Sequence, residues 1–134
     1  MKLSINSRVF TDNTNELEKD NIFVVSEQNE KFKIIALDGG FEVINAYELK
    51  NYLDMKSIKI IGITGTNGKT TIASLLYQLF KKEGYKVGLL STVKIMVDET
   101  EHKATHTTPD SLTINHYLNE MVEIGCEFCF MEVS

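Results

Sequence analysis

The chain has 134 residues, of which 43% are hydrophobic and 25% are charged, and its formal net charge is −5. This composition is typical of a globular protein and excludes a disordered or fibrous one, and no apolar run approaches the roughly 20 residues of a membrane span. The negative charge argues against a nucleic-acid partner, because displacing counterions needs a basic surface. We expect a cytoplasmic chain with no membrane partner, since the N-terminus lacks the long apolar stretch of a signal peptide.

Residues 1–57 are predicted to form a small α/β domain of their own. Short stretches typical of strands are separated there by polar turns such as "TDNTNE" and "DGG". The predicted strands are "NIFVVS", "KFKIIAL" and "FEVIN", and "AYELKNYLDM" is a predicted short helix that leads to the domain boundary. A core built from so few residues is marginal, so we expect this domain to pack against its neighbour.

From Ile58 onward the sequence alternates between strand and helix patterns. "IKIIGIT", residues 58–64, predicts a strand buried on both faces, and a glycine-rich turn follows it. Apolar residues then recur at the spacing of one helical face, and Gly84 is placed to end that helix. The residues on this face are Ile72, Leu75, Leu76, Leu79 and Phe80. "YKVGLLST", residues 85–92, predicts the next buried strand.

A hairpin and a second helix come next. "KIMVDETEHKA", residues 94–104, predicts a β-hairpin with Asp98 and Glu99 at its tip. "THTTPDSL" is predicted to open the helix, because Thr108 suits its N-cap and Pro109 its first position. The apolar face of this helix comprises Ile114, Tyr117, Leu118, Met121 and Val122.

Gly125 is placed to end the second helix, and "EFCFMEVS", residues 127–134, predicts a third strand. Strands joined by helices imply a parallel sheet. The predicted fold class is therefore α/β, with a small N-terminal α/β domain followed by part of a P-loop-type parallel-sheet ATPase domain.

The glycine-rich turn, "GITGTNGKTT" at residues 62–71, is the main functional signal. Such a turn between a buried strand and a helix forms an anion site, because backbone N–H groups and the helix N-terminus point at the ligand. Gly65 and Gly68 let the backbone approach a phosphate closely. Lys69 can reach the β- and γ-phosphates, and the Thr70 hydroxyl can bind Mg²⁺. The motif G-x-x-G-K-T lacks the first glycine of the usual P-loop, but its context predicts ATP and Mg²⁺ as ligands.

Three stretches resemble the Mur ligase family of ATP-dependent amide-forming enzymes. They are "GITGTNGKTT", "TTPDSL" at residues 107–112 and "MEVS" at residues 131–134, and their order and spacing also match. Within the family, the chain most resembles the UDP-N-acetylmuramoyl-tripeptide synthetases (MurE) of peptidoglycan synthesis. The resemblance implies that residues 1–57 bind the UDP substrate and that residues 58–134 form part of the central ATP-binding domain. It also implies that the chain is an N-terminal fragment of a three-domain enzyme, inactive as a ligase on its own.

The resemblance implies roles for individual residues as well. The ATP phosphates would be bound by Gly65, Thr66, Asn67, Gly68, Lys69, Thr70 and Thr71, with Lys69 acting in catalysis. Thr70 and Glu132 would bind Mg²⁺, although a carboxylate at a strand end is often only a solvated charge. Thr107, Thr108 and Ser134 would contact the UDP-linked substrate, and the alternative for the two threonines is simple helix capping.

The N-terminal region departs from the family pattern. "TDNT", residues 11–14, stands where members often have T-D-S-R. By resemblance, Asn13 or Thr14 would hydrogen-bond the nucleotide. An ordinary Asx turn explains the same residues equally well, because Asp and Asn favour such turns locally.

The implied reaction joins UDP-N-acetylmuramoyl-L-alanyl-D-glutamate to a free amino acid, either meso-diaminopimelate or lysine, through an acyl phosphate. We expect a monomer. A competing hypothesis is a folylpolyglutamate synthetase-like ligase, although Thr70 follows the lysine where that branch typically has glycine. The motif is also compatible with an unrelated P-loop kinase or synthetase and with an ATP-binding module without turnover.

Cys126 and Cys129 form a C-x-x-C pair, which occurs in redox sites and in zinc sites. A second pair of zinc ligands is absent from the sequence. We therefore expect both cysteines to be structural, in one strand and on opposite faces of the sheet.

Overall fold

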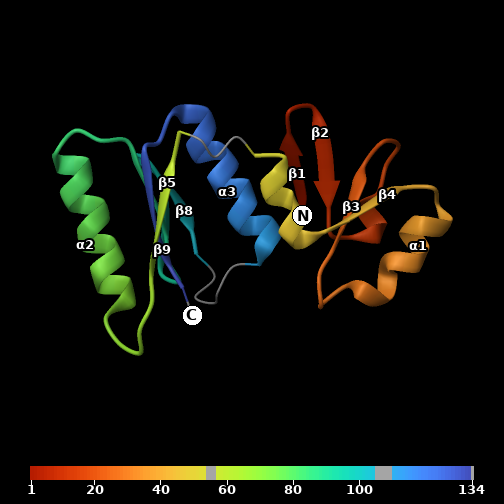
Figure 1. Cartoon of the computed structure of the whole chain (residues 1–134), viewed down its shortest axis with the longest axis horizontal. Helices are drawn as coiled ribbons and strands as arrows, with labels where there is room; N and C mark the ends of the chain where they lie inside the picture. The colour runs from red at the N-terminus through yellow and green to blue at the C-terminus, as the bar shows by residue number, and fades with distance from the viewer. Residues whose placement is uncertain (54–56, 105–109, 134) are drawn as a thin grey trace. The chain divides into compact units, whose positions relative to one another are not determined.

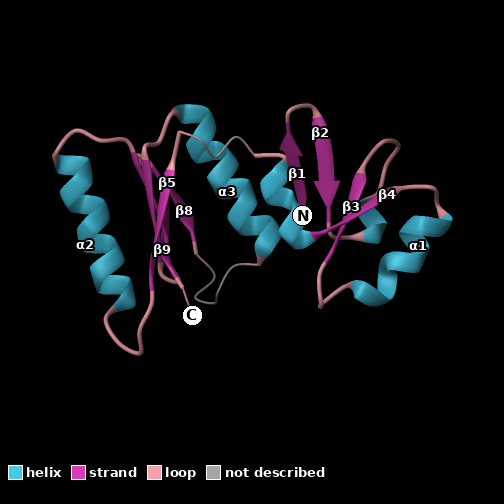
Figure 2. Cartoon of the chain, viewed as in Figure 1, coloured by secondary structure: helices cyan, strands magenta, loops and turns pink. Residues whose placement is uncertain are grey.

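The computed structural model describes residues 1–53, 57–104 and 110–133. The chain divides into two compact units, one made of Met1–Leu53 and Ser111–His116 and the other of Asp54–Asp110 and Tyr117–Ser134. Each unit has its own sheet (Figure 1) and combines strands with helices (Figure 2), which confirms the predicted α/β class.

The first unit contains a four-stranded sheet in the order β1-β2-β3-β4. The strands are β1 (Lys2–Ile5), β2 (Arg8–Thr11), β3 (Ile22–Val25) and β4 (Glu42–Asn45). β1 and β2 form an antiparallel hairpin that was not predicted from the sequence, and β2, β3 and β4 run parallel. The hairpin turn is Asn6–Ser7, whose φ angles of 49° and 69° are those of a two-residue turn that matches strand twist.

The prediction of a strand at "KFKIIAL" is wrong. The segment forms a 3-10 turn, Glu30–Phe32, followed by helix α1, Lys33–Asp38. The reason is topological: β3 and β4 are parallel neighbours, and parallel neighbours need a crossover connection, usually a helix. Ala36 is fully buried against Phe23 and Val25, whereas the apolar side chains that suggested a strand lie exposed. The predicted helix at "AYELKNYLDM" is a 3-10 helix, Ala46–Asn51, and a further 3-10 turn spans Thr14–Glu16.

The second unit contains a five-stranded sheet in the order β5-β9-β6-β7-β8. The strands are β5 (Lys59–Ile63), β6 (Val87–Leu90), β7 (Lys94–Val97), β8 (Thr100–Lys103) and β9 (Phe128–Glu132). β5, β9 and β6 are parallel, as predicted. β7 and β8 form the predicted antiparallel hairpin, which adds to β6 with Asp98 and Glu99 in its turn.

Two helices cover this sheet on opposite faces (Figure 1): α2 (Lys69–Lys82) on one side and the second half of α3 (Ser111–Ile124) on the other. Val87 and Leu89 of β6 belong to the core beneath α2. Gly88, between them, points to the other face, where the Met121 sulfur of α3 occupies the place a Cβ would need. β6 is thus buried along its whole length, as parallel strands covered on both faces are. The prediction of a strand buried on both faces at residues 58–64 is wrong: β5 is the edge strand of the sheet, and Lys59, Ile60 and Gly62 are exposed.

The buried face of α2 differs from the predicted one. Ala73 and Tyr77 are buried, and Leu76 and Phe80 pack beside them. Ile72, Leu75 and Leu79, predicted to be in the core, are 48%, 58% and 54% exposed. The small side chain of Ala73 lies against the sheet, so the helix is rotated from the orientation that its largest apolar residues suggested.

Both predicted helix ends are confirmed. Gly84 and Gly125 have φ angles of 96° and 88°, the left-handed conformation that favours glycine after a helix. Cys126 lies just before β9 rather than in it, so the two cysteines do not share a strand. The predicted cap at Thr108 and Pro109 lies outside the described residues.

Candidate nucleotide-binding site

The loop between β5 and α2 has the backbone of an anion-binding turn. Gly65 has a φ of 141° and Gly68 a φ of 80°, values that L side chains rarely adopt. α2 begins at Lys69, and its first backbone hydrogen bond runs from the Ile72 N–H to the Gly68 carbonyl, 2.9 Å. The amides of the first turn precede that bond, so they point out of the helix N-terminus, where an anion is favoured.

A small cavity of about 240 Å³ lies at this helix N-terminus. It is lined by Thr66, Asn67, Gly68, Lys69, Thr70, Thr71 and Glu132. The structure therefore brings together the predicted phosphate-binding and metal-binding residues, although Gly65 does not itself line the cavity. Lys69 lies close enough to Glu132 to contribute to lowering the pKa of that carboxyl group.

Thr70 and Glu132 meet although 62 positions separate them in the sequence. The Thr70 hydroxyl donates to Glu132 Oε2 at 2.9 Å. The sheet produces this contact, because β5 and β9 are parallel neighbours with Ile63 opposite Glu132. Both strands therefore end at the same edge, and the Val133 N–H donates to the Ile63 carbonyl there at 2.8 Å. This edge of a parallel sheet is where ligands of α/β proteins bind.

The pKa of Glu132 is lowered in this environment. Burial by itself raises the pKa, but hydrogen bonds from the Thr92 N–H and from the Thr70 and Thr92 hydroxyls, together with the charge of Lys69, outweigh burial. Glu132 is therefore a carboxylate at neutral pH. Thr92 was not predicted as a site residue.

The donor set fits Mg²⁺. A hydroxyl and a carboxylate are the hard oxygen ligands that Mg²⁺ prefers. The hydrogen bond of 2.9 Å between Thr70 and Glu132 places both groups within reach of one ion.

The other predicted substrate residues are placed differently or not described. The Asn13 side chain accepts the Asn15 N–H at 2.9 Å, which is the Asx turn that the sequence left open. Thr14 begins the 3-10 turn that follows. Thr107, Thr108 and Ser134 lie outside the described residues.

The first unit has a cavity of about 560 Å³ at the carboxyl ends of β3 and β4, which was not predicted from the sequence. Its lining comprises Val25, Ser26, Glu27, Gln28, Glu30, Asn45, Ala46, Tyr47 and Ser111. Asn29 is 8% exposed and fixes one wall of the cavity. Its amide donates to the Val24 carbonyl at 2.9 Å, and its Oδ1 accepts the Ser26 N–H at 2.7 Å.

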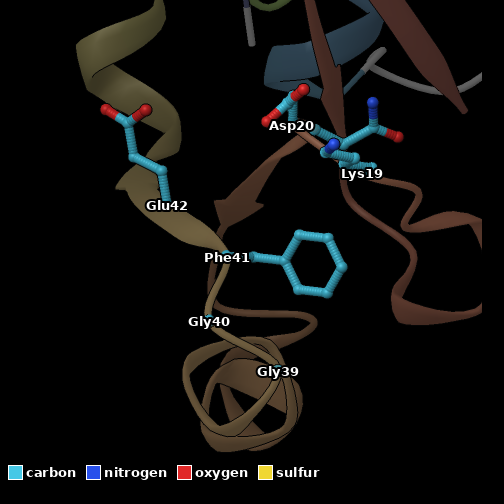
Figure 3. Close-up of a pocket in the computed structure, with 7 residues that line it drawn as sticks. Lys19, Asp20, Gly39, Gly40, Phe41 and Glu42 are labelled. Carbon is cyan, nitrogen blue, oxygen red and sulfur yellow. The ribbon is translucent and has the colours of Figure 1, made fainter.

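A second cavity, of about 420 Å³, lies at the opposite, amino ends of the same strands (Figure 3). The turn at Lys19 and Asp20 and the segment Gly39–Glu42 line it, and the Phe41 ring projects into it. Ligands of open α/β sheets bind at the carboxyl ends of strands, so the first cavity is the better candidate site in this unit.

Both cysteines are buried free thiols. Burial raises the pKa of Cys126 to about 11 and that of Cys129 to about 12. A protonated thiol is neither a nucleophile nor a metal ligand. Within the described ranges, His, Cys, Asp and Glu form no cluster able to hold a metal ion.

Comparison with known proteins gives the family. Residues 63–134 match the Mur ligase middle domain. The chain belongs to the Mur ligase family. That assignment confirms the resemblance seen in the sequence, and it sets aside an unrelated P-loop kinase.

Similar proteins within the Mur ligase family carry one name, UDP-N-acetylmuramoyl-L-alanyl-D-glutamate–2,6-diaminopimelate ligase. The chain is 42% identical to that of Parabacteroides distasonis over 124 residues, 88% of this chain and 26% of the relative. It is 42% identical to that of Helicobacter pylori over 128 residues, 92% of this chain and 28% of the relative. It is 55% identical to that of Cytophaga hutchinsonii over 86 residues, 63% of this chain and 18% of the relative.

The chain is also similar to a solved structure of a ligase with the same name, with a TM-score of 0.70 and 25% sequence identity. The match covers 93% of this chain and 31% of the chain in the solved structure. The chain thus spans about a quarter of the length of the Mur ligases that it matches. Among the described helices, none is long and apolar enough to cross a membrane.

Proposed function

We propose that this chain supplies the nucleotide site of an ATP-dependent ligase of peptidoglycan synthesis. The ligase joins a diamino acid to UDP-N-acetylmuramoyl-L-alanyl-D-glutamate. The pairing of Thr70 with Glu132 beside Lys69, at the N-terminus of α2, is the observation that carries the proposal. The names of the relatives favour 2,6-diaminopimelate over lysine as the added amino acid.

In this proposal, the loop amides of residues 65–71 and the Lys69 ammonium hold the triphosphate. Thr70 and Glu132 hold Mg²⁺, which when bound neutralises charge on the transferred phosphoryl group. A carboxylate oxygen of the UDP-linked substrate attacks the γ-phosphorus, an acyl phosphate forms and ADP leaves. The amine of the diamino acid then attacks the acyl carbon, loses a proton and expels phosphate. Positioning and charge neutralisation are what phosphoryl transfer requires of the protein.

The first unit is proposed to bind the UDP end of the substrate. The cavity at the carboxyl ends of β3 and β4 supports this role, because parallel sheets bind ligands at that edge. Asn13 and Thr14 remain candidate contacts to the nucleotide of the substrate. Asn13 would use atoms that do not take part in its Asx turn. Thr107, Thr108 and Ser134 are proposed to contact the same substrate. We further propose a cytoplasmic monomer.

A titration of the chain with ATP in the presence of Mg²⁺ tests the proposal. Lys69→Ala should weaken ATP binding at least tenfold, because a charged contact to phosphate is lost. Lys82→Ala is the matched control, since Lys82 is an exposed lysine at the other end of α2. Equal affinities for parent, Lys69→Ala and Lys82→Ala would refute the site.

The second candidate is an ATP-binding unit without turnover, because the residues that line the cavity at the loop account by themselves for nucleotide and metal binding. In the full-length protein, phosphate release from ATP in the presence of the UDP-linked substrate and diaminopimelate separates the two functions. ATP binding without substrate-dependent phosphate release would favour the second.

A further inference from the structure

Thr92 lies beside the carboxylate of the proposed metal site. It follows β6, which is the parallel neighbour of β9 with Leu90 opposite Met131. The register therefore brings Thr92 to the same sheet edge as Glu132. The Thr92 N–H donates to Glu132 Oε2 at 3.0 Å, and its hydroxyl lies 3.3 Å from the same oxygen.

A fixed turn holds Thr92 in this place. Ser91 is 2% exposed, and its hydroxyl donates to the Lys94 carbonyl at 2.7 Å. The same hydroxyl accepts the Lys94 N–H at 2.9 Å, while the Ser91 N–H donates to the Lys94 carbonyl at 3.1 Å. Three hydrogen bonds between Ser91 and Lys94 thus close the loop from β6 to β7. Thr92 is the middle residue of that loop, residues 91–93, and its N–H and hydroxyl are directed at Glu132.

The contacts to Glu132 are asymmetric. Oε2 accepts the Thr70 hydroxyl and both donors of Thr92. Oε1 has one long contact within the described part of the chain, 3.5 Å from the Thr92 hydroxyl. The carboxylate is thus held against Thr70 by one oxygen, and the other oxygen keeps capacity for a cation or for one of its waters.

We propose that Thr92 is a positioning residue, which fixes the Glu132 carboxylate beside Thr70 and so raises the affinity of the site for the divalent cation that accompanies ATP. This inference rests on the proposed function. Thr92 touches neither the reacting atoms nor the phosphates in this role and acts through Glu132. Its effect is therefore specific to the metal: without Thr92, the carboxylate can rotate away from Thr70, but the loop amides and Lys69 still bind the triphosphate.

Thr92→Val tests this role, because valine keeps the shape and the backbone N–H and removes only the hydroxyl. Thr92→Ser restores the hydroxyl, and Thr100→Val is a matched control at an exposed position in β8 of the same sheet. ATP affinity is measured by titration without metal and at increasing Mg²⁺ concentrations.

For Thr92→Val we expect a rise of about three- to tenfold in the Mg²⁺ concentration that gives half of the maximal increase in ATP affinity. The reason is the loss of one hydrogen bond to a charged group. Affinity for metal-free ATP should stay unchanged, Thr92→Ser should restore the parent value, and Thr100→Val should equal the parent. An unchanged Mg²⁺ dependence of ATP affinity in Thr92→Val would overturn the inference. Equal weakening of ATP binding with and without metal would overturn it as well, because it would show that Thr92 has only a structural role. In both cases the proposed function stands if Lys69→Ala still weakens ATP binding at least tenfold, whereas no ATP binding by the parent would refute both the inference and the proposed function.

Discussion

Glu132→Gln should weaken ATP binding in the presence of Mg²⁺ and should not weaken it in the absence of Mg²⁺. Glutamine keeps the shape of glutamate and one carbonyl oxygen that accepts from Thr70 and Thr92, but it removes the negative charge. That charge is present at neutral pH, because the pKa of Glu132 is lowered in the folded chain.

The magnitude follows from Coulomb's law. Unit charges 4 Å apart interact by about 4 kcal/mol at an effective dielectric constant of 20, and desolvation offsets part of that gain. We expect the Mg²⁺ concentration required for tight ATP binding to rise roughly 10- to 100-fold, about 1.4 to 2.8 kcal/mol. Without metal, the variant should bind ATP as well as the parent or better, because a carboxylate no longer faces the phosphates.

Calorimetric titration of parent and variant, each with Mg²⁺ and with EDTA, measures both effects. Thermal unfolding checks the fold, and we expect a loss of about 1 kcal/mol in the free energy of unfolding, since neutral hydrogen bonds replace charge-assisted ones. Glu83→Gln, an exposed position at the far end of α2, is the matched control. Equal weakening of ATP binding by Glu132→Gln with metal and with EDTA would refute the reasoning.

Two further predictions concern residues outside the metal site. Cys126 and Cys129 should react with a thiol reagent at pH 8 only after denaturation, because burial raises their pKa values to about 11 and about 12; fast labelling of the folded chain would show that the thiols are accessible. In the full-length enzyme, Thr107→Ala should raise the KM for the UDP-linked substrate without lowering the Tm, whereas Thr108→Ala should do both, since a lost helix cap costs roughly 1 kcal/mol. Unchanged KM and kcat in Thr107→Ala would leave helix capping as the role predicted for Thr107 and Thr108.

The phosphate-binding loop was predictable from sequence because its signal is local. Gly65, Gly68 and Lys69 lie within five positions, and the left-handed backbone at the two glycines follows from their lack of a side chain. The hairpin with Asp98 and Glu99 in its turn and the helix ends at Gly84 and Gly125 were predictable for the same reason.

The wrong predictions for α2 and for residues 31–37 have their cause in tertiary contacts. Periodicity favoured Ile72, Leu75 and Leu79 as the core face of α2, but Ala73 and Tyr77 face the sheet instead. Apolar content suggested a strand at residues 31–37, but the parallel pairing of β3 with β4 needs a helical crossover.

Thr92 was missed because its position depends on strand order. β9 lies between β5 and β6, and only that order brings Thr92 and Thr70 to the two sides of Glu132. A single sequence predicts that the three strands exist and are parallel. It does not predict which strand is central, because pairing between distant segments leaves no local pattern.

The most direct test of the account is a crystal structure of the chain with Mg²⁺ and a non-hydrolysable ATP analogue. The account predicts the triphosphate on the amides of residues 65–71 and a metal ion about 2.1 Å from the Thr70 hydroxyl oxygen. The Glu132 carboxylate should lie beside that ion, still hydrogen-bonded to Thr92. A triphosphate bound away from this loop, or a metal ion remote from both Thr70 and Glu132, would contradict the account.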